Sequence, residues 1–214
     1  MSQGRYRAEG PQAEFEPGSR GRVLRNHLGI RRVRDMQQAE SEALVTVQAW
    51  AIGHYSAAHR FTAADMRLLH RRWLGGIYPW AGEYRQVNVS KGGLVFAAAA
   101  QVPRLMETFE TRELALYTPC RGMDEPALVG ALARTHAELV LIHPFREGNG
   151  RCARLLAWLM ALQAGLPPLD FSPLAGRGRR SYFAAVQAAL GRDYAPLERC
   201  FSRVLGRTWR VCGR

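Results

Sequence analysis

The spacing of apolar residues predicts a chain built mainly of helices. Between residues 128 and 142, apolar side chains recur every three or four positions, and a second set makes another apolar side. A helix that is apolar on two sides is expected to be buried. We expect Asp124 to cap its start and Pro144 to end it at His143, because proline disfavours helical geometry in the preceding residue.

Residues 155–164 are apolar on every side and predict another buried helix, which Gly165 and Pro167 stop. The residues between these two helices, 143–154, are mostly polar. The sequence therefore predicts a polar loop held between two core helices. Such a loop fixes its side chains more tightly than a surface loop does.

Other segments also show helical signals. Residues 35–55 predict an amphipathic helix, on which we interpret Glu40 and Glu42 as solvent-facing rather than catalytic. Thr62 is the expected cap of the next helix, with Asp65 in its first turn. Three further helices are expected at about 101–116, 179–190 and 194–211.

A short β-hairpin is expected in the middle of the chain. Two β-like segments, 87–89 and 94–96, flank a turn formed by Ser90, Lys91, Gly92 and Gly93. An exposed strand edge can align a partner's extended segment through main-chain hydrogen bonds, although a small hairpin can also be a mere connection. Lys91 is the only lysine of the chain, and a contact role and a solvated turn position both stay open for it.

Composition limits the domain organisation. Residues 1–20 are rich in Gly, Pro, Glu and Arg and predict a flexible leader without the hydrophobic stretch of a secretory signal. Residues 21–214 are expected to form a single domain, because 47% hydrophobic residues in 214 suffice for one core. The longest apolar run, 155–164, is too short for a membrane span.

The run 143–154 concentrates the candidate chemistry. His143 can accept a proton near neutral pH, and Glu147 can hold a hard cation such as Mg2+. Gly148 and Gly150 allow backbone amides to converge on an anion, and the two following arginines can reach one phosphate chain. Taken singly, such residues usually cap helices, form turns or lie on solvated faces. Together, at this spacing, they predict a site that handles a nucleotide.

The same run resembles the Fic-domain signature, His-Pro-Phe-x-Asp/Glu-Gly-Asn-Gly-Arg-x-x-Arg, at every specified position. Residues 77–85 with 87–93 look like the second conserved block of that family, which precedes and forms a flap. Residues 23–30 are similar to the usual start of the domain, so the resemblance covers about 20–200. It implies an all-α fold, a Fic-type helical bundle with a short β-hairpin flap.

The resemblance implies a protein adenylyltransferase that moves AMP from ATP to a Tyr, Ser or Thr hydroxyl of a target protein. His143 would be the general base that deprotonates this hydroxyl, and Glu147 would bind Mg2+. Phe145 would point into the core and fix the loop. The other implied roles are an anion hole from Gly148, Asn149 and Gly150, phosphate contacts from Arg151 and Arg154, and target docking by the flap residues Ser90, Lys91, Gly92 and Gly93.

Position 150 separates two reactions within the family. A lysine there is typical of Doc-like kinases, which bind the nucleotide reversed and transfer the γ-phosphate. This chain has Gly150, so we expect nucleotidyl transfer, with a Doc-like kinase as an alternative.

The resemblance also bears on regulation and partners. Many Fic proteins carry an inhibitory helix with Ser/Thr-x-x-x-Glu, and no serine or threonine of this chain is followed four residues later by glutamate. This favours the class silenced by a small antitoxin protein that carries the motif. We therefore expect a toxin in the bacterial cytoplasm that acts on DNA gyrase or topoisomerase IV. A secreted effector that modifies host small GTPases is the alternative.

A net charge of +12 and a pI near 10.5 introduce a rival class, a basic nucleic-acid-binding module. Four arginines are expected on one side of the last helix: Arg199, Arg203, Arg207 and Arg210. Exposed aromatics interleaved with basic residues are not evident, so we expect a solvated face and no direct nucleic-acid ligand. The four cysteines lack C-x-x-C spacing, and we interpret Cys152 as a filler that faces the bundle.

Overall fold

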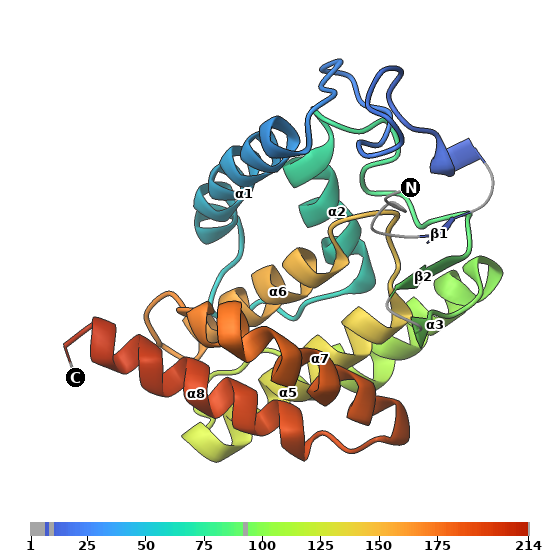
Figure 1. Cartoon of the computed structure of the whole chain (residues 1–214). Helices are drawn as coiled ribbons and strands as arrows, with labels where there is room; N and C mark the ends of the chain where they lie inside the picture. Colours follow the sequence, from blue (N-terminus) through green and yellow to red (C-terminus); the bar gives the residue numbers. More distant parts are fainter. Residues whose placement is uncertain (1–6, 9–10, 92–93, 214) are drawn as a thin grey trace. The chain divides into compact units, whose positions relative to one another are not determined.

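The computed structural model describes residues 7–8, 11–91 and 94–213, most of which are helical (Figure 1). The predicted class, a helical fold with one short hairpin, is confirmed. The α-helices are α1 (Val33–His54), α2 (Ala63–Leu74), α3 (Val102–Phe109), α4 (Ala115–Tyr117), α5 (Glu125–Ile142), α6 (Asn149–Gln163), α7 (Arg179–Ala188) and α8 (Ala195–Val211).

Most helix positions agree with the periodicity of the sequence, but one prediction needs correction. The helix expected at 101–116 is divided, because a π-helical segment, Glu110–Leu114, lies between α3 and α4. The second core helix begins at Asn149, ahead of the apolar run 155–164. Arg151 and Arg154 therefore both lie in the first turns of α6.

The chain forms two compact units. The first contains α1, α2, the sheet and the motif as far as Cys152. The second contains most of α5, the remainder of α6, and α7 and α8. His143, Glu147 and Arg151 thus belong to the first unit, and Arg154 belongs to the second.

Helices α1 and α2 pack together in the first unit. Helix α2 buries its Met66, Leu69, Trp73 and Leu74 side chains, as its apolar spacing predicts. The buried residues of α1 are Met36, Glu40, Val47 and Ala51. The interpretation of Glu40 as solvent-facing is therefore wrong, whereas Glu42 is exposed.

The hairpin is confirmed as strands β2 (Val89–Lys91) and β3 (Leu94–Val95), which pair antiparallel. The expected turn residues Gly92 and Gly93 lie outside the described residues. A third strand, β1 (Arg7–Ala8), pairs with the other edge of β2 and was not predicted.

Part of the segment expected to be a flexible leader is hydrogen-bonded to the first unit. The Gln12 side-chain oxygen accepts the Gln86 N–H at 3.0 Å, and its carbonyl accepts Arg146 Nε at 2.7 Å. Phe15 forms a β-bridge with Leu24. Composition did not reveal these contacts, because the partners of Gln12 lie 74 and 134 residues away in the sequence.

The second unit has an apolar core to which α8 contributes Leu197, Phe201, Val204 and Leu205. Cys152, the last motif residue of the first unit, is fully buried. Within the described residues, none of the helices has the length and apolar character that a membrane span needs.

Candidate active site

The motif loop runs from His143 to Gly148. These two end residues have a left-handed backbone conformation. His143 has φ +53° and Gly148 has φ +83°. A Cβ at Gly148 would lie 2.7 Å from Cζ3 of Trp73, so glycine is required there by both conformation and space. A strained non-glycine residue such as His143 is typical of functional sites.

The Asn149 side chain fixes the shape of this loop. Its Oδ1 accepts the Phe145 N–H, and its Nδ2 donates to the Phe145 carbonyl, both at 2.8 Å. Asn149 is fully buried. The structure therefore turns this side chain toward the loop backbone, whereas the family resemblance implied an anion hole. At the start of α6, the backbone N–H groups of Arg151 and Cys152 donate to the Gly148 carbonyl at 3.0 and 2.9 Å.

Phe145 is fully buried, as expected, and it stacks on His70 with 3.8 Å between ring centroids. His70 Nδ1 accepts the Gly82 N–H at 2.8 Å, so its Nε2 carries the proton and donates to the Glu147 carbonyl at 3.1 Å. Burial lowers the pKa of His70 to about 4. A neutral imidazole thus stacks on Phe145 and donates a hydrogen bond to the backbone of the motif loop.

His143 is the candidate base, and it lies beneath an aromatic cover. Its ring stacks on Phe96, just after β3, with 3.7 Å between centroids and a 19° tilt. The residue is only 4% exposed. The histidine is therefore held in place but covered by a residue that follows the flap.

Arg85 connects the flap to this histidine. It is 1% exposed, and its guanidinium donates to the carbonyls of His143 at 2.7 Å and Val87 at 2.8 Å, and to that of Ala97. Its own N–H donates to the Pro144 carbonyl at 2.8 Å. Both ends of the flap and the motif loop thus contact one buried cation, whose burial lowers its pKa to about 10.

Glu147 is the candidate magnesium ligand. Its Oε1 accepts the Gly148 N–H at 3.0 Å and lies 3.6 Å from Nη2 of Arg151. In the described part of the chain, no cluster of three His, Cys, Asp or Glu residues suits a metal ion. Magnesium commonly uses one or two carboxylates together with substrate phosphates, so a single anchored carboxylate fits this ion.

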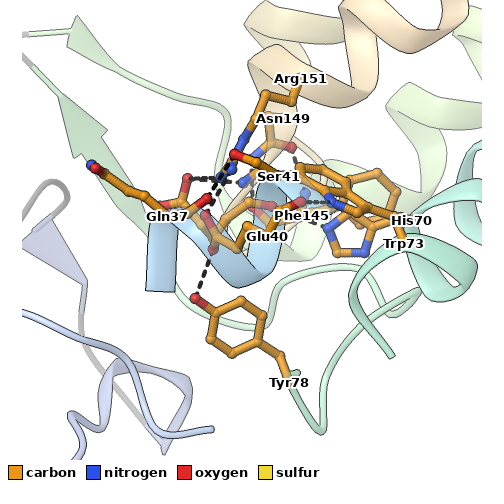
Figure 2. A network of polar contacts seen from close by, with 11 residues as sticks. Gln37, Glu40, Ser41, His70, Trp73, Tyr78, Phe145, Asn149 and Arg151 are labelled. Carbon is orange, nitrogen blue, oxygen red and sulfur yellow. Dashed lines mark hydrogen bonds and ion pairs between the residues drawn. The ribbon is translucent and has the colours of Figure 1, made fainter. Parts of the chain in front are cut away.

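Arg151 lies in a network of buried groups (Figure 2). Its Nη1 donates to Oε2 of Glu40 at 2.7 Å, and its guanidinium lies 4.7 Å above the Trp73 ring. Burial opposes the charge of Arg151, but Glu40 and Glu147 outweigh this effect, so its pKa is raised. Arg151 therefore stays cationic, as a phosphate contact requires.

Arg154 lies three residues after Arg151 on α6 but has different partners, in the second unit. Its guanidinium hydrogen-bonds to Tyr182. Since arginine only donates, the Tyr182 oxygen accepts, and its hydroxyl hydrogen can point to Nε2 of His136 at 2.8 Å. Burial, aided by the positive Arg154, lowers the pKa of His136 to about 3.

The flap residues that the structure describes are partly accessible. Ser90 pairs with Val95 across the hairpin and with Arg7 of β1 on the other side. Ser90 and Lys91 are half-buried, and Val95 is 75% exposed. Both edges of β2 are thus already paired, so an extended segment of a partner would have to pair with the edge of β3.

Three supporting residues were missed by sequence reasoning: Glu40, His70 and Arg85. Glu40 lies four residues after Met36 and seven before Val47, on the buried stripe of α1. His70 adjoins Leu69 on the buried side of α2. The helical spacing of both residues therefore indicated burial. Their polar side chains, however, are of the kind usually expected at solvent-exposed positions. For Arg85 no local pattern exists, because its partners are backbone carbonyls.

Comparisons with known proteins agree with this geometry. The model of the Fic/DOC family matches residues 60–161. Protein adenylyltransferase VbhT of Bartonella schoenbuchensis is 32% identical over 143 residues, which are 67% of this chain and 30% of that protein. The probable protein adenylyltransferase Fic of Escherichia coli is 26% identical over 187 residues, 86% of this chain and 88% of that protein. The chain thus spans less than a third of VbhT.

The fold has solved counterparts. The crystal structure of BepC from Bartonella tribocorum, a VirB-translocated effector protein with bound AMPPNP, has a TM-score of 0.68 and 22% identity. The match covers 85% of this chain and 91% of that chain. The signature at 143–154, the family model and the shared fold lead to one conclusion: this chain belongs to the Fic/DOC family.

Proposed function

We propose that this protein transfers AMP from ATP to a hydroxyl side chain of a target protein. The observation that carries the proposal is the first unit's arrangement of the motif residues His143, Glu147 and Arg151, each held by contacts within that unit. Relatives named protein adenylyltransferases support the same activity. The second unit contributes Arg154, one turn further along α6.

The proposed roles follow from the chemistry of adenylyl transfer. His143 takes the proton of the incoming hydroxyl as its oxygen attacks the α-phosphate. The amides around Gly148 and Gly150 bind the phosphate oxygens, while Arg151 and Arg154 bind the phosphate chain. Magnesium, which Glu147 would hold, neutralises phosphate charge when bound. The protein thus contributes positioning and charge rather than covalent chemistry.

Access to His143 requires a movement at the flap. Phe96 stacks on the imidazole and the Nε2 atom of His143 is buried, so an incoming hydroxyl reaches this nitrogen only after the groups around it move. A target segment that pairs with the edge of β3 would act on the residues just before Phe96. We propose that docking at the flap, including Ser90 and Lys91, uncovers the base.

For the biological setting, we propose a toxin held inactive by a small antitoxin with a Ser/Thr-x-x-x-Glu helix. The support is that the chain has no such motif of its own. DNA gyrase and topoisomerase IV are the proposed targets. The likeness to BepC, an effector translocated by the VirB system, favours a second candidate, a secreted effector that modifies host small GTPases.

The reaction is tested with ATP labelled at either the α- or the γ-phosphate, incubated with bacterial lysate and the purified protein. The proposal predicts labelled protein only from the α-labelled nucleotide. Label transferred only from the γ-phosphate would establish a Doc-like kinase instead and refute nucleotidyl transfer. The antitoxin proposal is tested by adding a helical protein that carries the motif, which should abolish labelling.

A further inference from the structure

Glu40 is a buried carboxylate of α1 that lies outside the signature motif. It is 4% exposed, and Tyr78 and Arg151 approach it from opposite sides (Figure 2). The Tyr78 hydroxyl donates to Oε1 at 2.8 Å, and Nη1 of Arg151 donates to Oε2 at 2.7 Å. Each oxygen of this carboxylate therefore has its own donor.

The backbone of Glu40 also takes part. Its carbonyl accepts Nε1 of Trp73 at 2.8 Å, and the Trp73 ring lies against the Arg151 guanidinium. One residue of α1 thus fixes Arg151 twice, through its carboxylate and through the aromatic ring that it orients. Arginine loses side-chain rotamer entropy when it is fixed, and here folding rather than substrate binding bears that loss.

The network leaves one guanidinium nitrogen of Arg151 without a hydrogen bond. Its Nη1 is engaged by Glu40, whereas Nη2 is buried, makes no hydrogen bond within the described residues and lies 3.6 Å from Glu147. Nη2 therefore lies on the side of Glu147, the candidate magnesium ligand. A phosphate bound by this metal would meet a guanidinium that is already aligned.

We propose that Glu40 is a positioning residue that holds Arg151 for the phosphate chain of the nucleotide, with Tyr78 as the anchor of Glu40. The inference rests on the proposed function, since it takes Arg151 as a phosphate contact. Tyr78 is suited to anchor a carboxylate, because burial and the neighbouring Glu40 raise its pKa and keep the phenol protonated. It therefore always donates, and Glu40 keeps one oxygen turned toward Arg151.

Calorimetric titration with Mg2+ and a non-hydrolysable ATP analogue tests this inference without any target protein. Glu40→Gln should weaken binding of the ATP analogue about tenfold. Losses of about this size are typical when a side chain that binds a ligand loses the partner that orients it. Tyr78→Phe, which keeps the ring but loses the anchor, should weaken binding by a smaller factor. The matched control is Glu42→Gln, an exposed glutamate on the same helix, which should bind like the wild type.

A double-mutant cycle separates positioning from general damage to the fold. In an Arg151→Gln background, Glu40→Gln should cause no further loss of affinity, because its effect passes through Arg151. Equal losses in both backgrounds would overturn the inference. Tighter binding by Glu40→Gln would also overturn it, because Glu40 would then compete with phosphate for Arg151.

The outcomes distinguish this inference from the proposed function. If the wild-type protein binds no nucleotide, the proposed function fails and the inference fails with it. If the wild type binds and a folded Glu40→Gln binds equally well, only the inference fails. Should Glu40→Gln not fold, Tyr78→Phe and its cycle with Arg151→Gln decide the question in the same way.

Discussion

His143 and Gly148 set the geometry of the motif loop at its two ends. Both have positive φ, and a Cβ added at Gly148 would also lie 2.7 Å from Cζ3 of Trp73. Directly after Gly148, the Asn149 amide closes a hydrogen-bonded ring with the Phe145 backbone. Conformation, rather than side-chain chemistry alone, is therefore what several motif residues supply.

Replacing Gly148 with alanine should destabilise the protein by about 2 kcal/mol or more, because the new Cβ meets Trp73 and the backbone is strained. The control is Gly206→Ala in α8, where a Cβ meets nothing within 4 Å. That change should stabilise by about 0.5–1 kcal/mol. Urea denaturation measures both, and equal effects would contradict the role given to Gly148.

The buried histidines predict a dependence of stability on pH. The pKa is about 4 for His70 and about 3 for His136, against 6.5 in an unfolded chain. Unfolding therefore takes up protons as the pH falls below 6.5. The free energy of unfolding should be fully retained above pH 6.5 and decrease toward pH 4, by on the order of 3 kcal/mol for each histidine.

Denaturation at a series of pH values tests this prediction. His70→Gln should flatten the decrease between pH 6.5 and 4, whereas His27→Gln, at an exposed position, should leave it as in the wild type. An unchanged slope in His70→Gln would show that this imidazole is not kept neutral by burial.

At this scale the sequence identifies the signature residues but not the residues that support them. The signature is local, so spacing alone reveals it. Glu40 is 111 positions before Arg151, and no sequence distance indicates their pairing. The only indication in the sequence was a charged residue on the apolar stripe of a helix. This pattern indicates a buried ion pair only when the partner is known.

The flap and the motif loop are coupled at the level of elements through Arg85. Its guanidinium contacts the carbonyls of Val87 and Ala97 on either side of the hairpin and that of His143 in the loop. A guanidinium can reach several acceptors at once, whereas an ammonium is a compact charge on a flexible stem. The two strands of the flap are too short to be stable alone, so we expect the hydrogen bonds of Arg85 to help keep them ordered.

Arg85→Lys should loosen the flap and lower the rate of transfer. Hydrogen bonds from a charged donor contribute about 1.5–3 kcal/mol each, so losing one should accelerate amide exchange of β2 and β3 at least about tenfold. Hydrogen exchange measures this directly, with Arg104→Lys at an exposed position of α3 as control. Unchanged exchange in the flap would contradict the coupling.

The sequence predicts the long helices well, because their apolar spacing is continuous. It misses the π-helical segment Glu110–Leu114, where one irregular turn leaves the apolar spacing almost intact. It also misses β1, because a strand of two residues pairs through its main chain and needs no particular composition. Local pattern therefore predicts the elements that bury side chains, but not those held by backbone contacts.

At the scale of the whole molecule, the excess of positive charge is the property that the fold does not explain. The four arginines of α8 are exposed, as expected, and Arg207 pairs with Asp170 at 3.0 Å. A surface of this kind attracts polyanions without a specific site. It is therefore the feature most open to confusion with nucleic-acid binding.

Filter binding of duplex DNA at increasing salt separates these alternatives. Diffuse attraction predicts binding at about 50 mM salt that is largely lost by about 200 mM, without sequence preference. Substituting the four α8 arginines with glutamine should lower the low-salt binding and leave nucleotide binding unchanged. Tight, sequence-dependent binding that persists at the higher salt would support the rival class.

The central claim, that His143 in this loop serves adenylyl transfer, is tested most directly by mass spectrometry of proteins modified in bacterial lysate. Lysate treated with the wild-type protein, ATP and Mg2+ should contain a protein that carries an AMP adduct on a hydroxyl side chain. Lysate treated with folded His143→Ala should lack it. An adduct that forms equally with His143→Ala, or an adduct of a single phosphate, would contradict the account.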